Sequence, residues 1–157
     1  MSIILQTMTI ANSLDALDEV ARFILSVAAR AELPQQTTYR LRLAVDEVVT
    51  NIITHGFTDT DPHTPINLSA TIDDQQLKIE LVDRGMPYDP QQILPAKETL
   101  HLPPQERPLG GLGFFLALWG VDAFHYKPKK DGNYTIFVIK RPFCTGSPAE
   151  LTVEEPL

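Results

Sequence analysis

The chain has 157 residues, of which 43% are hydrophobic and 21% charged, values typical of one globular domain with a single core. Its formal net charge of −7 argues against non-specific binding to nucleic acid or to an anionic membrane surface. The single cysteine, Cys144, excludes an internal disulfide, and no apolar run is long enough to span a membrane, so we expect a soluble cytoplasmic protein.

The first third of the chain predicts one strand and two helices. Residues 2–10 are rich in β-branched side chains, which favour a strand. Asn12 or Ser13 then caps an amphipathic helix that extends to about residue 31. Pro34 opens the second helix, because a proline at the first helical position loses no hydrogen bond.

Two hairpins are predicted in the remainder. Residues 66–72 and 76–83 alternate apolar and polar side chains on either side of a short turn. Residues 121–127 and 133–140 form the second pair, with Asp131-Gly132 as the turn. This order predicts an α+β fold, in which helices cover one face of a mostly antiparallel sheet in a two-layer sandwich.

Less regular segments separate and follow these hairpins. The proline-rich connection 86–108 shows no periodicity, which in a compact domain usually indicates a functional or disordered segment. A glycine-rich turn and a short apolar helix over residues 114–119 follow it. We expect residues 1–143 to form the folded domain and residues 144–157 a loose acidic tail.

The second predicted helix carries the first candidate site. Glu47 and Asn51 are four residues apart, so they lie one turn apart on the same side of the helix. Val48 and Ile52 belong to an apolar stripe that faces the core. A carboxylate and an amide held in this way suit a proton acceptor and a divalent cation ligand, although such pairs are usually just solvated.

Two further motifs lie after strands or before helices. Asp83 ends a predicted strand, where an acceptor-only carboxylate can bind the exocyclic amine of adenine and Gly85 lets the backbone approach a flat base. Asp-x-Gly is also a common turn. The run Gly110-Gly111-Leu112-Gly113 opens a helix, and its free N–H groups favour phosphate, although a flexible hinge has the same composition.

These three motifs together resemble the GHKL ATPase and kinase superfamily, and in particular its anti-sigma-factor serine/threonine kinases. The resemblance covers about residues 2–141 and rests on Asp-Glu-Val-Val-Thr-Asn with His-Gly, on Asp-Arg-Gly with Tyr-Asp-Pro, and on Gly-Gly-Leu-Gly. It implies a Bergerat-type ATP-binding fold. The second glycine that is usual in the wider superfamily is Pro87 here.

The resemblance assigns roles to single residues. Glu47 is expected to be the general base, Asn51 the Mg²⁺ ligand and Asp83, with Gly85, the adenine site. Gly111 and Gly113 are expected to contact the phosphates of ATP beneath a lid formed by residues 86–108. The family also suggests that Arg107 neutralises phosphate charge and that His55 lines the phosphate pocket, for which helix capping is the alternative.

The resemblance also implies a function. The chain is expected to use Mg-ATP to phosphorylate a STAS-type anti-sigma antagonist, with a sigma factor as a second candidate partner and a homodimer as the common assembly. Two alternatives remain: a module that holds nucleotide and sequesters a partner without turnover, and an ATPase with water as acceptor. The retention of both Glu47 and Asn51 argues against pure sequestration.

Overall fold

The computed structural model describes residues 1–55, 64–85, 120–142 and 150–153. The helical elements are η1 (Leu14–Ala16), α1 (Leu17–Arg30) and α2 (Gln35–His55). The strands are β1 (Ile3–Ile10), β2 (Ile66–Ile72), β3 (Gln76–Asp83), β4 (Ala123–Lys129), β5 (Gly132–Lys140) and β6 (Glu150–Val153).

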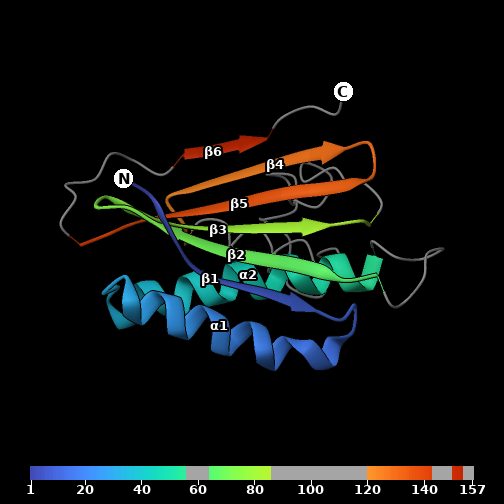
Figure 1. The fold of residues 1–157 in the computed structure, drawn as a ribbon, viewed down its shortest axis with the longest axis horizontal. Coiled ribbons are helices and arrows are strands. Elements are labelled where there is room, and N and C mark those ends of the chain that lie inside the picture. The colour runs from blue at the N-terminus through green and yellow to red at the C-terminus, as the bar shows by residue number, and fades with distance from the viewer. Residues whose placement is uncertain (56–63, 86–119, 143–149, 154–157) are drawn as a thin grey trace, which may run out of the picture.

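The described strands form one sheet in the order β1-β2-β3-β5-β4-β6. Neighbouring strands are antiparallel except β4 and β6, which are parallel. Helices α1 and α2 lie side by side on one face of this sheet (Figure 1). The predicted α+β two-layer sandwich is therefore confirmed.

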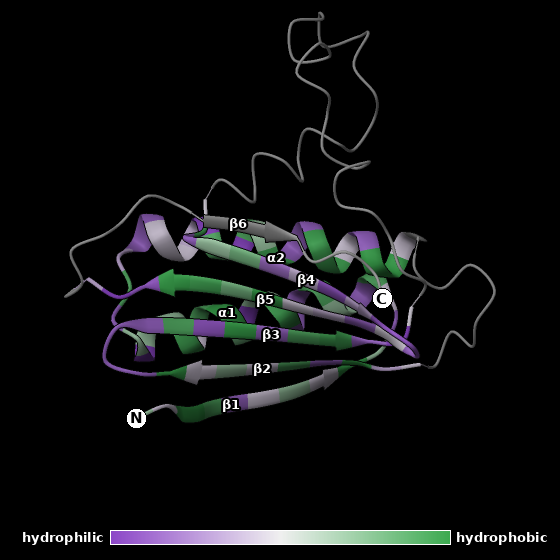
Figure 2. Cartoon of the chain, turned by 90° about the horizontal axis from the view of Figure 1, so that it is seen from above, coloured by the Kyte–Doolittle hydropathy of each residue, from purple (hydrophilic) through white to green (hydrophobic). Residues whose placement is uncertain are grey.

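The core lies between the helices and this face of the sheet. Alternate residues of β3 are buried, and its ribbon alternates between hydrophobic and hydrophilic residues (Figure 2). The same alternation continues in β2 and β5, as expected of strands with one covered face. From the helices, the fully buried side chains include Val20, Ile24 and Val27 of α1 and Leu41, Val45 and Val48 of α2.

Element bounds agree closely with the sequence pattern in the first hairpin and less closely in the second. β2 and β3 have the predicted bounds, and β1 and β5 differ from theirs by one residue. β4 begins at Ala123, two residues later than predicted. The reason is Asp122, whose carboxylate accepts a hydrogen bond of 2.7 Å from the backbone of Lys140 and so holds a bend before the strand.

Two other features refine the predictions. Ser13 is the N-cap: its hydroxyl accepts a hydrogen bond of 3.3 Å from the Asp15 N–H, and the first turn is the 3₁₀ helix η1. The segment 144–157, expected to be a loose acidic tail, contributes the short strand β6, which extends the sheet beside β4. Residues 150–153 are ordered because their backbone pairs with the edge of β4, which would otherwise be unpaired.

Candidate functional site

Asp83 is one of three buried polar residues in the described part of the chain, with Asn133 and Thr135. It ends β3, and only 2% of its surface is exposed. Its Oδ1 atom accepts hydrogen bonds of 2.8 Å from the Gly85 N–H and 3.0 Å from the amide Nδ2 of Asn133. The same Asn133 amide group also donates to the Gly85 carbonyl oxygen at 3.3 Å. The carboxylate is therefore fixed on one of its two oxygens.

The second oxygen of Asp83 is buried and has no hydrogen-bond partner among the described residues. Burial raises the pKa of Asp83, and the hydrogen bonds from Asn133 and Gly85 oppose the rise. Leaving a buried acceptor unpaired costs on the order of 1–3 kcal/mol. Oδ2 is thus an acceptor whose desolvation a ligand donor would compensate.

The sequence analysis missed two polar residues of β5 that face the same interior. Asn133 lies directly opposite Asp83 in the antiparallel register, and Thr135 lies opposite Leu81. Both are buried, and the Thr135 hydroxyl has no hydrogen-bond partner among the described residues. The available signal was that they occupy the two positions that continue the core-facing alternation of Phe137 and Ile139.

Glu47 and Asn51 lie on α2 as predicted, one turn apart and partly buried, while Val48 and Ile52 beside them are in the core. The Asn51 Nδ2 atom is buried without a hydrogen-bond partner in the described part of the chain. Because a side-chain amide can present its oxygen in place of its nitrogen, this site can also offer an oxygen ligand.

The acidic neighbour of Glu47 has a different environment. The Asp46 carboxylate lies 3.6 Å from the guanidinium of Arg42, one turn earlier on α2. Burial raises the pKa of Asp46, and the Arg42 charge opposes that rise. Asp46 is therefore engaged within the helix, whereas Glu47 has no ion pair with any described residue.

Helix α2 and strand β3 end on the same side of the molecule. Both elements run toward the same end of the two-layer sandwich, where β5 also begins (Figure 1). The sheet register places Asn133 beside Asp83 at that end. The structure thus places Asp83 and the C-terminal end of the helix that carries Glu47 and Asn51 at the same end of the fold.

Other predicted site residues lie outside the described residues: Arg107, Gly111 and Gly113, together with the predicted lid 86–108 and the helix 114–119. His55 is the last residue of α2, of which only the backbone is described. Within the described ranges, no group of three His, Cys, Asp or Glu side chains could hold a metal ion, and no helix is long and apolar enough to cross a membrane.

Comparisons with known proteins agree with this geometry. A family model for the histidine kinase-like ATPase domain matches residues 10–139. The chain is 32% identical over 103 residues to an anti-sigma F factor of Clostridium beijerinckii, covering 66% of this chain and 69% of that protein. It is 28% identical over 123 residues to the serine-protein kinase RsbW of Oceanobacillus iheyensis, covering 76% of this chain and 75% of that protein.

A solved structure of RsbU and RsbW domains from Mycobacterium tuberculosis has the same fold. It superposes with a TM-score of 0.61 over 94% of this chain and 35% of that chain. The sequence identity is 14%, so this similarity concerns the fold alone.

Proposed function

The chain belongs to the histidine kinase-like ATPase domain family, and on this basis we propose that it is an anti-sigma-factor-type serine/threonine kinase. It would bind Mg-ATP and transfer the γ-phosphoryl group to a hydroxyl group of a partner protein. The observation that carries the proposal is the buried Asp83 carboxylate, one oxygen of which is fixed by Asn133 and Gly85 while the other is unpaired.

That carboxylate fits adenine. An ionised carboxylate can only accept hydrogen bonds, and the exocyclic amine of adenine is a donor. Binding would therefore give Asp83 Oδ2 the partner that it lacks among the described residues. The buried Thr135 hydroxyl, also unpaired there, supplies a second polar contact for the base or for a water molecule beside it.

Glu47 and Asn51 fit the reacting end of the nucleotide. Mg²⁺ prefers oxygen ligands and keeps several waters, so one amide oxygen from Asn51 with phosphate oxygens is a sufficient donor set. When bound, Mg²⁺ neutralises phosphate charge. The Glu47 carboxylate then accepts the proton of the attacking serine or threonine hydroxyl. From the family resemblance, His55, Arg107, Gly111 and Gly113 would complete the phosphate site.

The names of the relatives suggest the partners. One relative is named an anti-sigma F factor and another a serine-protein kinase. We therefore propose that the acceptor is a STAS-type anti-sigma antagonist, that a sigma factor is the alternative partner, and that the protein acts as a homodimer. The reaction would then release or recapture the sigma factor by partner switching.

The experiment is calorimetric titration with Mg-ATP of the wild type, Asp83→Asn and Asn51→Ala. We expect wild-type binding that Asp83→Asn weakens by at least tenfold and that Asn51→Ala makes independent of Mg²⁺. Phosphate transfer from labelled ATP to purified STAS proteins then separates a kinase from a sequestering module, and release of free phosphate without acceptor identifies an ATPase. Failure of the wild type to bind any adenine nucleotide would refute the proposal.

A further inference from the structure

A buried chain of hydrogen bonds leads from β4 across β5 to Asp83. The Tyr126 hydroxyl of β4 donates to Asn133 Oδ1 at 2.5 Å, and Asn133 Nδ2 donates to Asp83 Oδ1 at 3.0 Å. Tyr126 is 1% exposed, Asn133 1% and Asp83 2%. Three adjacent strands of the sheet thus contribute to one buried polar network.

We infer that Tyr126 and Asn133 are positioning residues that set the base specificity of the nucleotide site. They hold the Asp83 carboxylate with Oδ1 occupied and Oδ2 available as an acceptor. The inference rests on the proposed function, because it concerns how Asp83 recognises the base of the bound nucleotide. It goes beyond that function in assigning adenine selectivity to two residues that need not contact the nucleotide.

The tyrosine is the donor that favours the observed orientation of the Asn133 amide. A side-chain amide has a donor end and an acceptor end, and rotation by half a turn exchanges them. Tyr126 donates its hydroxyl proton to Oδ1, so Nδ2 faces Asp83. Without that hydroxyl, Oδ1 of Asn133 can turn toward the carboxylate, where two acceptors oppose each other unless Asp83 takes up a proton.

Protonation of Asp83 would change which group at C6 of the base can pair with its carboxyl group. An ionised Oδ2 accepts from the amine at C6 of adenine and repels the carbonyl oxygen at C6 of hypoxanthine or guanine. A protonated Oδ2 is also a donor, and can pair with that carbonyl. The Asn133 contact therefore favours adenine in two ways, by fixing the carboxylate and by keeping it ionised.

Few other polar or charged groups of the described residues lie near the Asp83 carboxylate. The Gly85 N–H supplies the second hydrogen bond to Oδ1, and Arg84, its charged neighbour in the chain, is exposed. From β5 the facing group is the neutral Asn133 amide, and from β4 it is the Tyr126 hydroxyl behind that amide. No charged described side chain makes an ion pair with Asp83.

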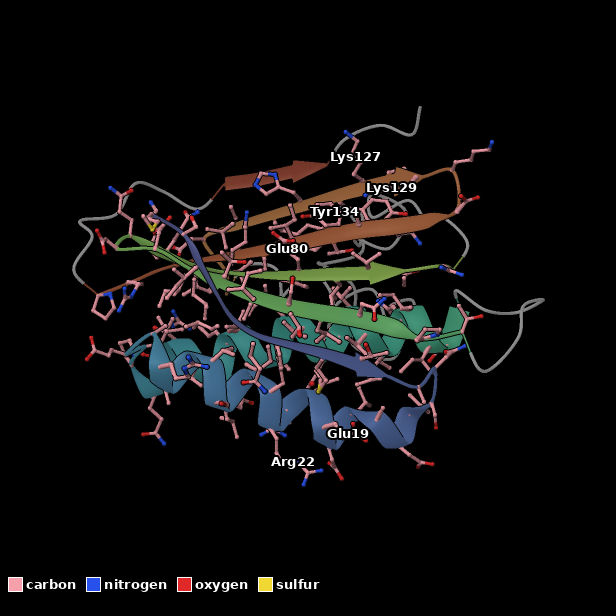
Figure 3. All side chains as sticks on the ribbon, in the orientation of Figure 1. Glu19, Arg22, Glu80, Lys127, Lys129 and Tyr134 are labelled. Carbon is pink, nitrogen blue, oxygen red and sulfur yellow. The ribbon has the colours of Figure 1, made fainter. Side chains whose placement is uncertain are left out.

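The test compares binding of Mg-ATP and Mg-ITP, two nucleotides with different groups at C6, by the wild type, Tyr126→Phe and Asn133→Ala. Tyr126→Phe keeps the buried ring and removes only the hydroxyl. It therefore still tests the inference if Asn133→Ala fails to fold. The matched control is Tyr134→Phe. Tyr134 is on the same strand as Asn133 but on the other face of the sheet, beside Glu80 and Lys129 (Figure 3).

We expect the ratio of ATP to ITP affinity to fall about two- to tenfold in Tyr126→Phe and to stay at its wild-type value in Tyr134→Phe. The loss of ATP affinity in Tyr126→Phe should also increase as the pH is lowered. Unchanged selectivity in both Tyr126→Phe and Asn133→Ala, with wild-type ATP binding intact, would overturn the inference and leave the proposed function standing. Absence of ATP binding by the wild type would instead overturn both.

Discussion

The Asn133 amide donates to the Asp83 carboxylate at 3.0 Å, although the two residues are 50 positions apart in the chain. The contact exists because β5 returns antiparallel to β3 and pairs Asn133 directly with Asp83. It places a buried carboxylate at the end of a strand with only one oxygen satisfied. The other oxygen has no hydrogen-bond partner among the described residues, and the adenine amine of the proposed nucleotide would supply one.

Asp83→Asn should weaken ATP binding strongly without destabilising the fold. The variant keeps an acceptor for Asn133 and Gly85 but places an amide NH₂ where Oδ2 was, so that two donors meet at the adenine amine. We expect ATP affinity to fall by about 10- to 150-fold, which corresponds to about 1.5–3 kcal/mol for a hydrogen bond to a charged group. Calorimetry and urea unfolding of the nucleotide-free protein measure the two quantities.

The raised pKa of Asp83 fixes the sign of its contribution to the pH dependence of stability. Because its pKa is raised in the folded state, that state binds more protons than the unfolded chain between pH 3.8 and the raised value. The contribution of Asp83 to the free energy of unfolding therefore decreases as pH rises through that window. Asp83→Asn should remove this dependence of the free energy of unfolding on pH. The exposed Asp74→Asn is the control. Greatly reduced stability of Asp83→Asn at pH 7 would contradict the assignment.

Glu47→Gln should separate nucleotide binding from turnover. The amide retains the shape of the side chain but cannot accept the hydroxyl proton, so we expect ATP affinity close to wild type and a phosphotransfer rate reduced about 10²- to 10⁴-fold. Single-turnover transfer from labelled ATP measures that rate. Asp46→Asn is the matched control, because Asp46 is paired with Arg42 and should affect the rate far less. Equal losses in both variants would remove Glu47 as the base.

Much of this fold could be predicted because its signals are local. Alternation along residues 66–72 and 76–83 gave the first hairpin, and apolar spacing with Pro34 gave α2. Asp83 could be identified because it ends a strand before Gly85. Strand β6 could not, because its four residues are too short a pattern by themselves and are ordered by pairing with β4.

The missed site residues share a physical cause. Asn133 and Thr135 appear as ordinary polar residues near a turn, and only the β3–β5 register shows that they are buried beside Asp83 and Leu81. Polar residues at core-facing positions of a strand are the sign to look for. Their burial and Tyr126 as hydrogen-bond partner of Asn133 depend on contacts between distant segments, which a local pattern does not contain.

Gly132→Ala should displace the end of β3 and so disturb the proposed nucleotide site. Gly132 has a φ of 150°, and a Cβ atom added there would lie 2.0 Å from the Asp83 carbonyl oxygen and 2.8 Å from the Arg84 Cα. Both neighbours are backbone, so the end of β3 must move. We expect a loss of roughly 2 kcal/mol or more in stability and weaker ATP binding, measured by thermal unfolding and calorimetry. Asp131→Ala, in the same turn, should change neither, and a tolerated Gly132→Ala would contradict the close packing.

Asp73→Ala should weaken the β2–β3 turn through the loss of two backbone contacts. Asp73 Oδ1 accepts hydrogen bonds of 2.7 Å from the Gln75 N–H and 2.8 Å from the Gln76 N–H. The first of these is the main cause of the lowered pKa of Asp73. We expect a loss of about 1 kcal/mol at pH 7, the usual net value of such contacts.

The pH dependence of this loss has the opposite sign to that of Asp83. Because the folded-state pKa of Asp73 is lowered, its contribution is present above pH 3.8 and disappears as pH falls through the lowered value. The wild type and Asp73→Ala should therefore converge in acid unfolding experiments. The adjacent Asp74→Ala, which removes an exposed carboxylate from the same turn, should follow the wild type throughout. Equal destabilisation by the two variants would mean that turn charge, and not the Asp73 contacts, stabilises this hairpin.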